Sequence, residues 1–139
     1  MSVLASIRPD SWNLPLLVHV LGAMVLVGSA ALGSFAALTS GGATESSFLF
    51  VSLPAYIVMR IGAEWLYSKE FGSASDDPTW IGIGYITADG GALFLLVTLI
   101  LSGIAVRRGS TGLTRAAGIV SLIAVVAWLV AVWAMSGKP

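Results

Sequence analysis

The stretch AAGIVSLIAVVAWLVAVWAM, residues 116–135, runs for 20 residues without an ionisable side chain. A helix of about 20 apolar residues is long enough to cross the roughly 30 Å hydrocarbon core of a bilayer. The whole chain of 139 residues agrees with this, since 57% of it is hydrophobic and only 10% is charged. Soluble domains usually carry about 25% charged residues. The stretch therefore predicts a membrane-spanning helix in an integral membrane protein.

Three further apolar segments precede it, and together the predicted spans cover residues 13–38, 47–67, 81–106 and 116–135. The connections between them are short, polar and rich in the Gly, Ser, Asp and Pro that interrupt helices. The segments do not alternate between apolar and polar residues, as the strands of a membrane β-barrel would. The sequence therefore predicts an all-α fold: a membrane-embedded antiparallel four-helix bundle, forming a single domain over residues 1–139.

Composition also limits the function and the partners. The formal net charge is zero, which removes the electrostatic basis for binding nucleic acid. The chain has no cysteine, so disulfides, thiolate metal sites and cysteine nucleophiles are excluded. No phosphate loop, zinc motif or arrangement of Ser, His and Asp supports an enzyme. We expect a non-enzymatic protein surrounded by a lipid bilayer, with its first apolar segment retained as a span because no secretory signal pattern precedes it.

The positive-inside rule gives an expected orientation. Three basic residues lie on each side of the predicted bundle: Arg107, Arg108 and Arg115 in the connection between the third and fourth spans, and Arg8, Lys69 and Lys138 opposite. The three arginines cluster in one short connection, whereas the opposite side contains the acidic stretch KEFGSASDD, residues 69–77. Both features favour termini that face outside the cell.

Small residues predict where the helices approach one another. Ser29 and Gly33 are four residues apart in the first span, as are Ala30 and Ser34. Such spacing places small side chains on one face, where another helix of the bundle can pack closely. Pro54, inside the second span, removes a backbone donor and is predicted to bend that helix.

Four ionisable residues lie within the predicted spans: His19, Arg60, Glu64 and Asp89. Threading the chain back and forth places all four in the half of the membrane nearer the termini. Arg60 and Glu64 are separated by four residues, so they share a helix face and can form an ion pair. Pairing reduces the cost of a charge in the membrane, which is at least about 2.5–3.5 kcal/mol.

The depth of Asp89 has two readings: counting from Trp80 places it near the middle of the membrane, whereas counting about 20 residues back from Arg107 places it just inside the interface. The stretch TADGGAL favours the second, because an Asp can cap the start of a helix and Gly90 and Gly91 would loosen the backbone there.

Three interpretations of these residues remain open. In the first, His19, Arg60, Glu64 and Asp89 form an intramembrane site for an ion, a proton or a small ligand. In the second, the chain is a redox subunit whose haem or copper is bound by His19 with Met24, Met59 or another subunit. In the third, the Arg60–Glu64 pair only neutralises itself, and the chain is a structural subunit of a homo-oligomer or a larger membrane complex.

The segment LPLLVHVLGAMVLVGSAAL, residues 14–32, resembles the first helix of small bacterial integral membrane proteins related to the copper-resistance protein D group. His19 and Gly28 are the residues that carry the resemblance. Members of the group often have a tryptophan shortly after the histidine, where this chain has Met24 and Val25. The resemblance implies a protein of the bacterial inner membrane.

Overall fold

The computed structural model describes residues 13–40, 47–72 and 79–136. These residues form four helices: α1 (Asn13–Thr39), α2 (Ser47–Glu70), α3 (Thr79–Arg108) and α4 (Thr111–Ser136). All four are long and apolar enough to cross a membrane. The described ranges contain no strand, so the prediction of an all-α membrane bundle is confirmed.

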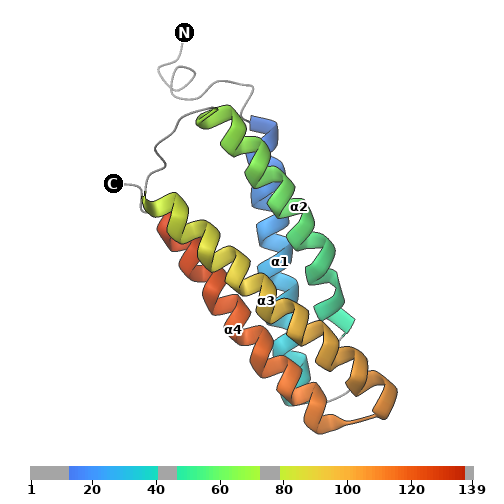
Figure 1. Ribbon diagram of the computed structural model, residues 1–139. Coiled ribbons are helices and arrows are strands. Elements are labelled where there is room, and N and C mark those ends of the chain that lie inside the picture. Colours follow the sequence, from blue (N-terminus) through green and yellow to red (C-terminus); the bar gives the residue numbers. More distant parts are fainter. Residues whose placement is uncertain (1–12, 41–46, 73–78, 137–139) are drawn as a thin grey trace.

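The four helices are arranged as two antiparallel hairpins (Figure 1). Contacts between α1 and α2 hold the first hairpin together, and contacts between α3 and α4 hold the second. The hairpins join mainly through α1 and α4, whereas α2 and α3 make few contacts with each other. The bundle therefore has one closed side, along α1 and α4, and one sparsely packed seam, between α2 and α3.

The connection between α3 and α4 is shorter than the sequence suggests. Gly109 adopts a φ of 60°, a left-handed conformation that ends a helix at little cost for glycine. The hydroxyl of Ser110 then accepts a hydrogen bond of 3.3 Å from the backbone N–H of Leu113, which caps α4. The two helices are closer along the chain than the predicted spans 81–106 and 116–135, because a run of apolar residues measures the part of a helix inside hydrocarbon and not the whole helix.

Small residues let α1 and α2 pack at close range. A Cβ atom added to Gly22 would lie 2.6 Å from the backbone nitrogen of Met59, and one added to Gly62 would lie 2.5 Å from that of His19. Further along α1 in the same interface, the hydroxyls of Ser29 and Ser52 are 2.9 Å apart and share a hydrogen bond. The two helices can adopt this spacing only because their contact points lack side chains or carry very short ones.

The predicted small-residue face of α1 is confirmed as a packing surface within the bundle, since all of its members are buried: Ser29, Ala30, Gly33 and Ser34. It contacts both neighbours of α1. A Cβ atom on Gly33 would collide with Leu49 of α2, while Gly118 of α4 lies against Ala37 and the carbonyl of Ser34. Helix α2 is continuous through Pro54, and the predicted bend there stays a prediction.

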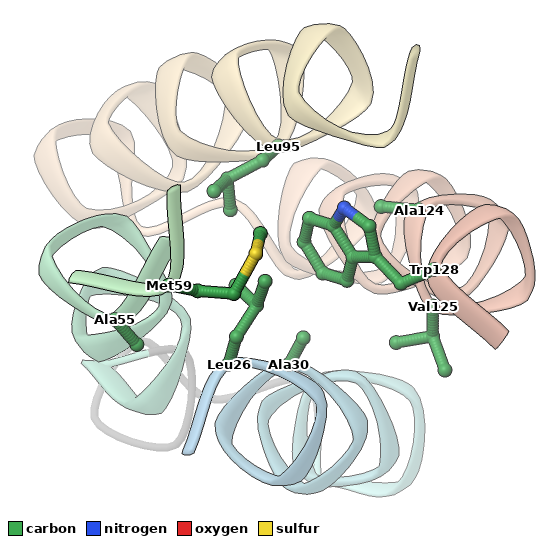
Figure 2. Packing of buried hydrophobic residues seen from close by; sticks show 8 residues of the cluster. All are labelled: Leu26, Ala30, Ala55, Met59, Leu95, Ala124, Val125 and Trp128. Carbon is green, nitrogen blue, oxygen red and sulfur yellow. The ribbon is translucent and has the colours of Figure 1, made fainter. Parts of the chain in front are cut away.

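The hydrophobic core lies where the two hairpins meet, and Figure 2 shows eight of its residues. They come from all four helices: Leu26, Ala30, Ala55, Met59, Leu95, Ala124, Val125 and Trp128. The largest of them, Trp128, fits against α3 because Gly91 offers no side chain there. Its indole N–H donates a hydrogen bond of 3.2 Å to the carbonyl oxygen of Ala88. Trp128 thus joins α4 to α3 by packing and by a polar contact.

Candidate functional site

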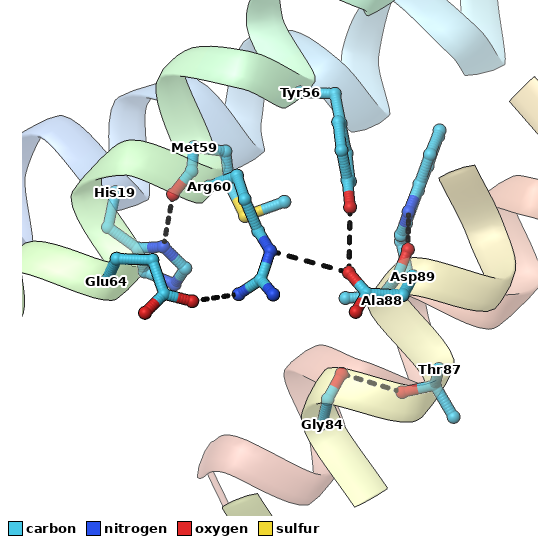
Figure 3. Close-up of polar contacts among 10 residues, drawn as sticks. His19, Tyr56, Met59, Arg60, Glu64, Gly84, Thr87, Ala88 and Asp89 are labelled. Carbon is cyan, nitrogen blue, oxygen red and sulfur yellow. Dashed lines mark hydrogen bonds and ion pairs between the residues drawn. The ribbon is translucent and has the colours of Figure 1, made fainter. Parts of the chain in front are cut away.

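A group of polar side chains bridges the seam between α2 and α3, and we call it the charged cluster: Tyr56, Arg60, Glu64 and Asp89 (Figure 3). Within α2, Arg60 Nη1 lies 2.6 Å from Glu64 Oε1. Across the seam, Arg60 Nε lies 3.4 Å from Asp89 Oδ1. The same Asp89 oxygen accepts a hydrogen bond of 2.9 Å from the hydroxyl of Tyr56. The cluster therefore links the two hairpins where few other contacts do.

The arginine at the centre of the charged cluster also packs on an aromatic ring. Its guanidinium carbon lies 4.4 Å from the centroid of the Tyr85 ring, within the range of a cation–π interaction. The side chains of Glu64 and Asp89 are 56% and 53% exposed, whereas that of Arg60 is 30% exposed. Two carboxylates share one guanidinium, so the cluster has a formal charge of −1 when both are ionised.

Regular helix geometry accounts for most of the charged cluster. Tyr56, Arg60 and Glu64 are spaced by four residues and so lie on one face of α2. Asp89 lies well inside α3, which begins at Thr79. Its predicted role as a helix cap is therefore wrong. The two glycines after it do not interrupt the helix, which runs on to Arg108. Gly91 instead provides the space for the Trp128 indole.

His19 does not join the charged cluster. Its Nδ1 lies 3.1 Å from the carbonyl oxygen of Met59, across the α1–α2 interface (Figure 3). Among the described residues, the ion pairs and hydrogen bonds of the cluster connect Arg60, Glu64 and Asp89 without it. The structure thus brings three of the four predicted site residues into contact and places the fourth against the neighbouring backbone.

A cavity of about 680 Å³ is lined mainly by α1 and α4, with Met59 of α2 and Ala88 of α3. His19 forms part of its wall, with Trp128 and Met135 of α4. A second cavity of about 60 Å³ also contacts His19 and continues toward Tyr85. His19 and Met135 therefore line both the larger cavity and the smaller one, whose wall also includes Tyr85 beside the charged cluster.

The candidate metal ligands are His19, Met24 and Met59. Within the described ranges, no three His, Cys, Asp or Glu residues are grouped so that they could hold a metal ion. Met24 and Met59, the suggested partners of His19, line the large cavity together with it. The prediction that His19 would be the ligand of any metal stays a prediction.

Sequence reasoning missed the aromatic members of this region. Tyr56 was detectable, because it precedes Arg60 by the same four-residue step that separates Arg60 from Glu64. Tyr85 and Trp128 were not, since their roles depend on the packing of α3 against α2 and α4. Local spacing reports contacts within one helix, and contacts between helices require the tertiary arrangement.

The fold and these polar groups define a class: a multi-pass membrane protein of four helices with ionisable side chains inside its predicted spans. Comparisons with protein-family models, with curated proteins and with solved structures find no match. The functional interpretation therefore depends on the geometry of the chain itself.

Proposed function

We propose that the protein binds a proton or a small monovalent cation at the charged cluster and passes it along the seam between α2 and α3. The observation that carries this proposal is the ratio of two carboxylates, Glu64 and Asp89, to one guanidinium, Arg60. All three lie within helices that are apolar enough to span a membrane. Binding one proton or one monovalent cation would bring the formal charge of the cluster to zero.

The energetic reason is the cost of charge in hydrocarbon. An uncompensated charge near the centre of a bilayer costs at least about 2.5–3.5 kcal/mol, and such residues usually face a wet cavity or mark an ion path. The carboxylates are about half exposed along the sparsely packed seam, so an ion can reach them. Their oxygens and the Tyr56 hydroxyl are the hard ligands that small cations prefer.

The competing interpretation is that the cluster only fastens one hairpin to the other. Asp89 is the residue that separates the two interpretations, because it contacts both Arg60 and Tyr56 across the seam. Glu64 is less informative for stability, since Arg60 keeps Asp89 as a partner when Glu64 is replaced. A double replacement of Arg60 and Glu64 by apolar residues removes that ion pair and leaves Asp89 with its hydrogen bond from Tyr56.

The test is a flux assay in proteoliposomes containing a pH-sensitive dye, run with a proton gradient and then with a potassium or sodium gradient. The variants are Asp89→Asn and the double replacement Arg60→Met with Glu64→Leu, and thermal unfolding in detergent reports their stability. Thr87→Val is the matched control, because among the described residues the Thr87 hydroxyl donates only to the carbonyls of Ile83 and Gly84 in its own helix. We expect folded variants with at least tenfold less flux, and a control that behaves as the unmodified protein.

Two results would reject the ion-binding function. The first is the absence of flux above empty liposomes in the unmodified protein. The second is a stable double variant that retains full flux, which would show that the cluster only joins the hairpins. We also propose that the protein lies in the bacterial inner membrane with its termini outside, a proposal supported by the basic residues near the spans.

A further inference from the structure

The short connection between α3 and α4 brings three arginines together, and we call them the basic turn: Arg107, Arg108 and Arg115. Arg107 and Arg108 are the last two residues of α3, and Arg115 follows the first residue of α4, Thr111, by four positions. This connection lies at the end of the bundle opposite the start of α1 (Figure 1). At 1.5 Å per residue, Arg115 is about 6 Å from the start of α4. A long arginine side chain can extend over that distance, so the three guanidinium groups can reach one level.

The positive charge of the basic turn is not compensated by the described part of the chain. All three arginines are exposed. Among the described residues, no ion pair or hydrogen bond involves their side chains. The end of α1 and the start of α2, which lie at the same end of the bundle, contain no Asp or Glu within the described ranges. Arg60 differs in this respect, because it contacts two carboxylates.

Helix electrostatics account for only two of the three charges. Arg107 and Arg108 lie in the last turn of α3, where the negative end of the helix dipole favours cations. Arg115 lies near the N-terminus of α4, which is the positive end of that helix. A cation there gains nothing from the dipole of its own helix. The position of Arg115 therefore favours an anion that comes from outside the described chain.

Exposed apolar side chains continue from these arginines toward the middle of the bundle. In α4, Ile119 and Leu122 follow Arg115 by four and seven residues, so the three share one helix face. Ile119 is 54% exposed and Leu122 is 40% exposed. In α3, the exposed Ile104 precedes Arg107 by three residues. The surface thus has cations at its end and lipid-facing hydrocarbon beside them, which is the complement of a lipid with an anionic headgroup.

We propose that the basic turn binds an anionic phospholipid, whose phosphate contacts the guanidinium groups and whose acyl chains lie along the exposed face of α4. A free phosphate would match the charge but would leave the apolar side chains next to Arg115 without a partner. A zwitterionic headgroup carries its own cation, which opposes binding to three arginines. The proposal goes beyond the ion function of the charged cluster and does not depend on it, because Arg60, Glu64 and Asp89 are not part of this surface.

The test measures lipid binding to the purified full-length protein in a neutral detergent by native mass spectrometry. Phosphatidylglycerol and phosphatidylcholine with identical acyl chains are titrated separately. Each basic residue near an anionic membrane surface strengthens attraction by about fivefold, so we expect three arginines to favour phosphatidylglycerol by about 100-fold. This comparison uses the unmodified chain and does not depend on the folding of any variant.

Three variants then locate the site. Arg115→Gln should weaken phosphatidylglycerol binding by about fivefold. Replacing all three arginines by Gln should remove the preference for phosphatidylglycerol and leave phosphatidylcholine binding unchanged. Lys69→Gln is the matched control, because it removes one exposed positive charge from the last turn of α2, at the other end of the bundle. It should change the binding of neither lipid.

Four outcomes would overturn the proposal. Equal affinity of the two lipids for the unmodified chain would show that the headgroup charge is not recognised. A preference that survives in the triple variant would place the site elsewhere. An equal loss in Lys69→Gln and Arg115→Gln would show that only the overall charge of the protein attracts the lipid. Displacement of phosphatidylglycerol by water-soluble glycerol phosphate at the same concentration would show that the arginines bind free phosphate and that the acyl chains contribute nothing.

Discussion

Replacing Gly91 by alanine tests how closely Trp128 packs against α3. A Cβ atom at Gly91 would lie 2.8 Å from Cδ1 and 2.9 Å from Cε2 of the Trp128 indole. Comfortable carbon–carbon contacts are at about 3.5–4.0 Å, so the ring must retreat by roughly 0.7 Å or more. That movement breaks or weakens the hydrogen bond from Trp128 to the Ala88 carbonyl. Gly90 provides the matched control, because a Cβ atom there has nothing within 4 Å.

The expected magnitude combines two losses. Forcing extra bulk into a packed core costs about 1–3 kcal/mol, and a hydrogen bond between membrane helices is worth about 0.6–1.7 kcal/mol. We therefore expect Gly91→Ala to be about 2–4 kcal/mol less stable than Gly90→Ala, while Gly90→Ala stays within about 1 kcal/mol of the unmodified chain. Reversible unfolding in mixed micelles, followed by circular dichroism, measures both. Equal stability of the two alanine variants would refute the described packing of α3 against α4.

Two other predictions concern the first hairpin and the orientation. Gly62→Ala should destabilise the protein by at least about 2 kcal/mol in the same unfolding assay, because its Cβ would lie 2.5 Å from the α1 backbone. Gly28→Ala is the control: its Cβ meets no atom within 4 Å, so the free energy of unfolding should not change. An unchanged stability of Gly62→Ala would show that α1 and α2 are farther apart than described above. Single cysteines at Ser40 and Ser110 should both be protected from an impermeant thiol reagent in intact cells while one at Gly72 is labelled, and the opposite pattern would place the termini inside.

The fold was largely predictable because hydrophobicity decides which segments enter a bilayer. The predicted spans 13–38 and 47–67 begin at the same residues as α1 and α2. Helix α4 contains the predicted fourth span but begins five residues before it, at Thr111, because Arg115 precedes the apolar run while still belonging to the helix. Helix ends depend on caps such as Ser110, which an apolar count does not detect.

The candidate site was predictable only where its contacts are local. The pairing of Arg60 with Glu64 follows from their spacing on one helix. The contact between Arg60 and Asp89 requires α2 and α3 to meet at a particular height and rotation, which no local pattern specifies. His19 was grouped with these residues because of its expected depth. Depth alone does not give the direction in which a side chain points, and His19 points toward the Met59 carbonyl.

The division into two hairpins has a consequence for biosynthesis. The partners of the α1–α2 pair, and those of the α3–α4 pair, are neighbours along the chain, so each pair can form as soon as its second helix has been made. The face of α1 that contains Ser34 and Ala37 must wait, because its partner Gly118 is in α4, which is synthesised after α1, α2 and α3. Until then, this small-residue face is available to other helices in the membrane, and a chaperone or insertase that shields it would protect the chain from premature association.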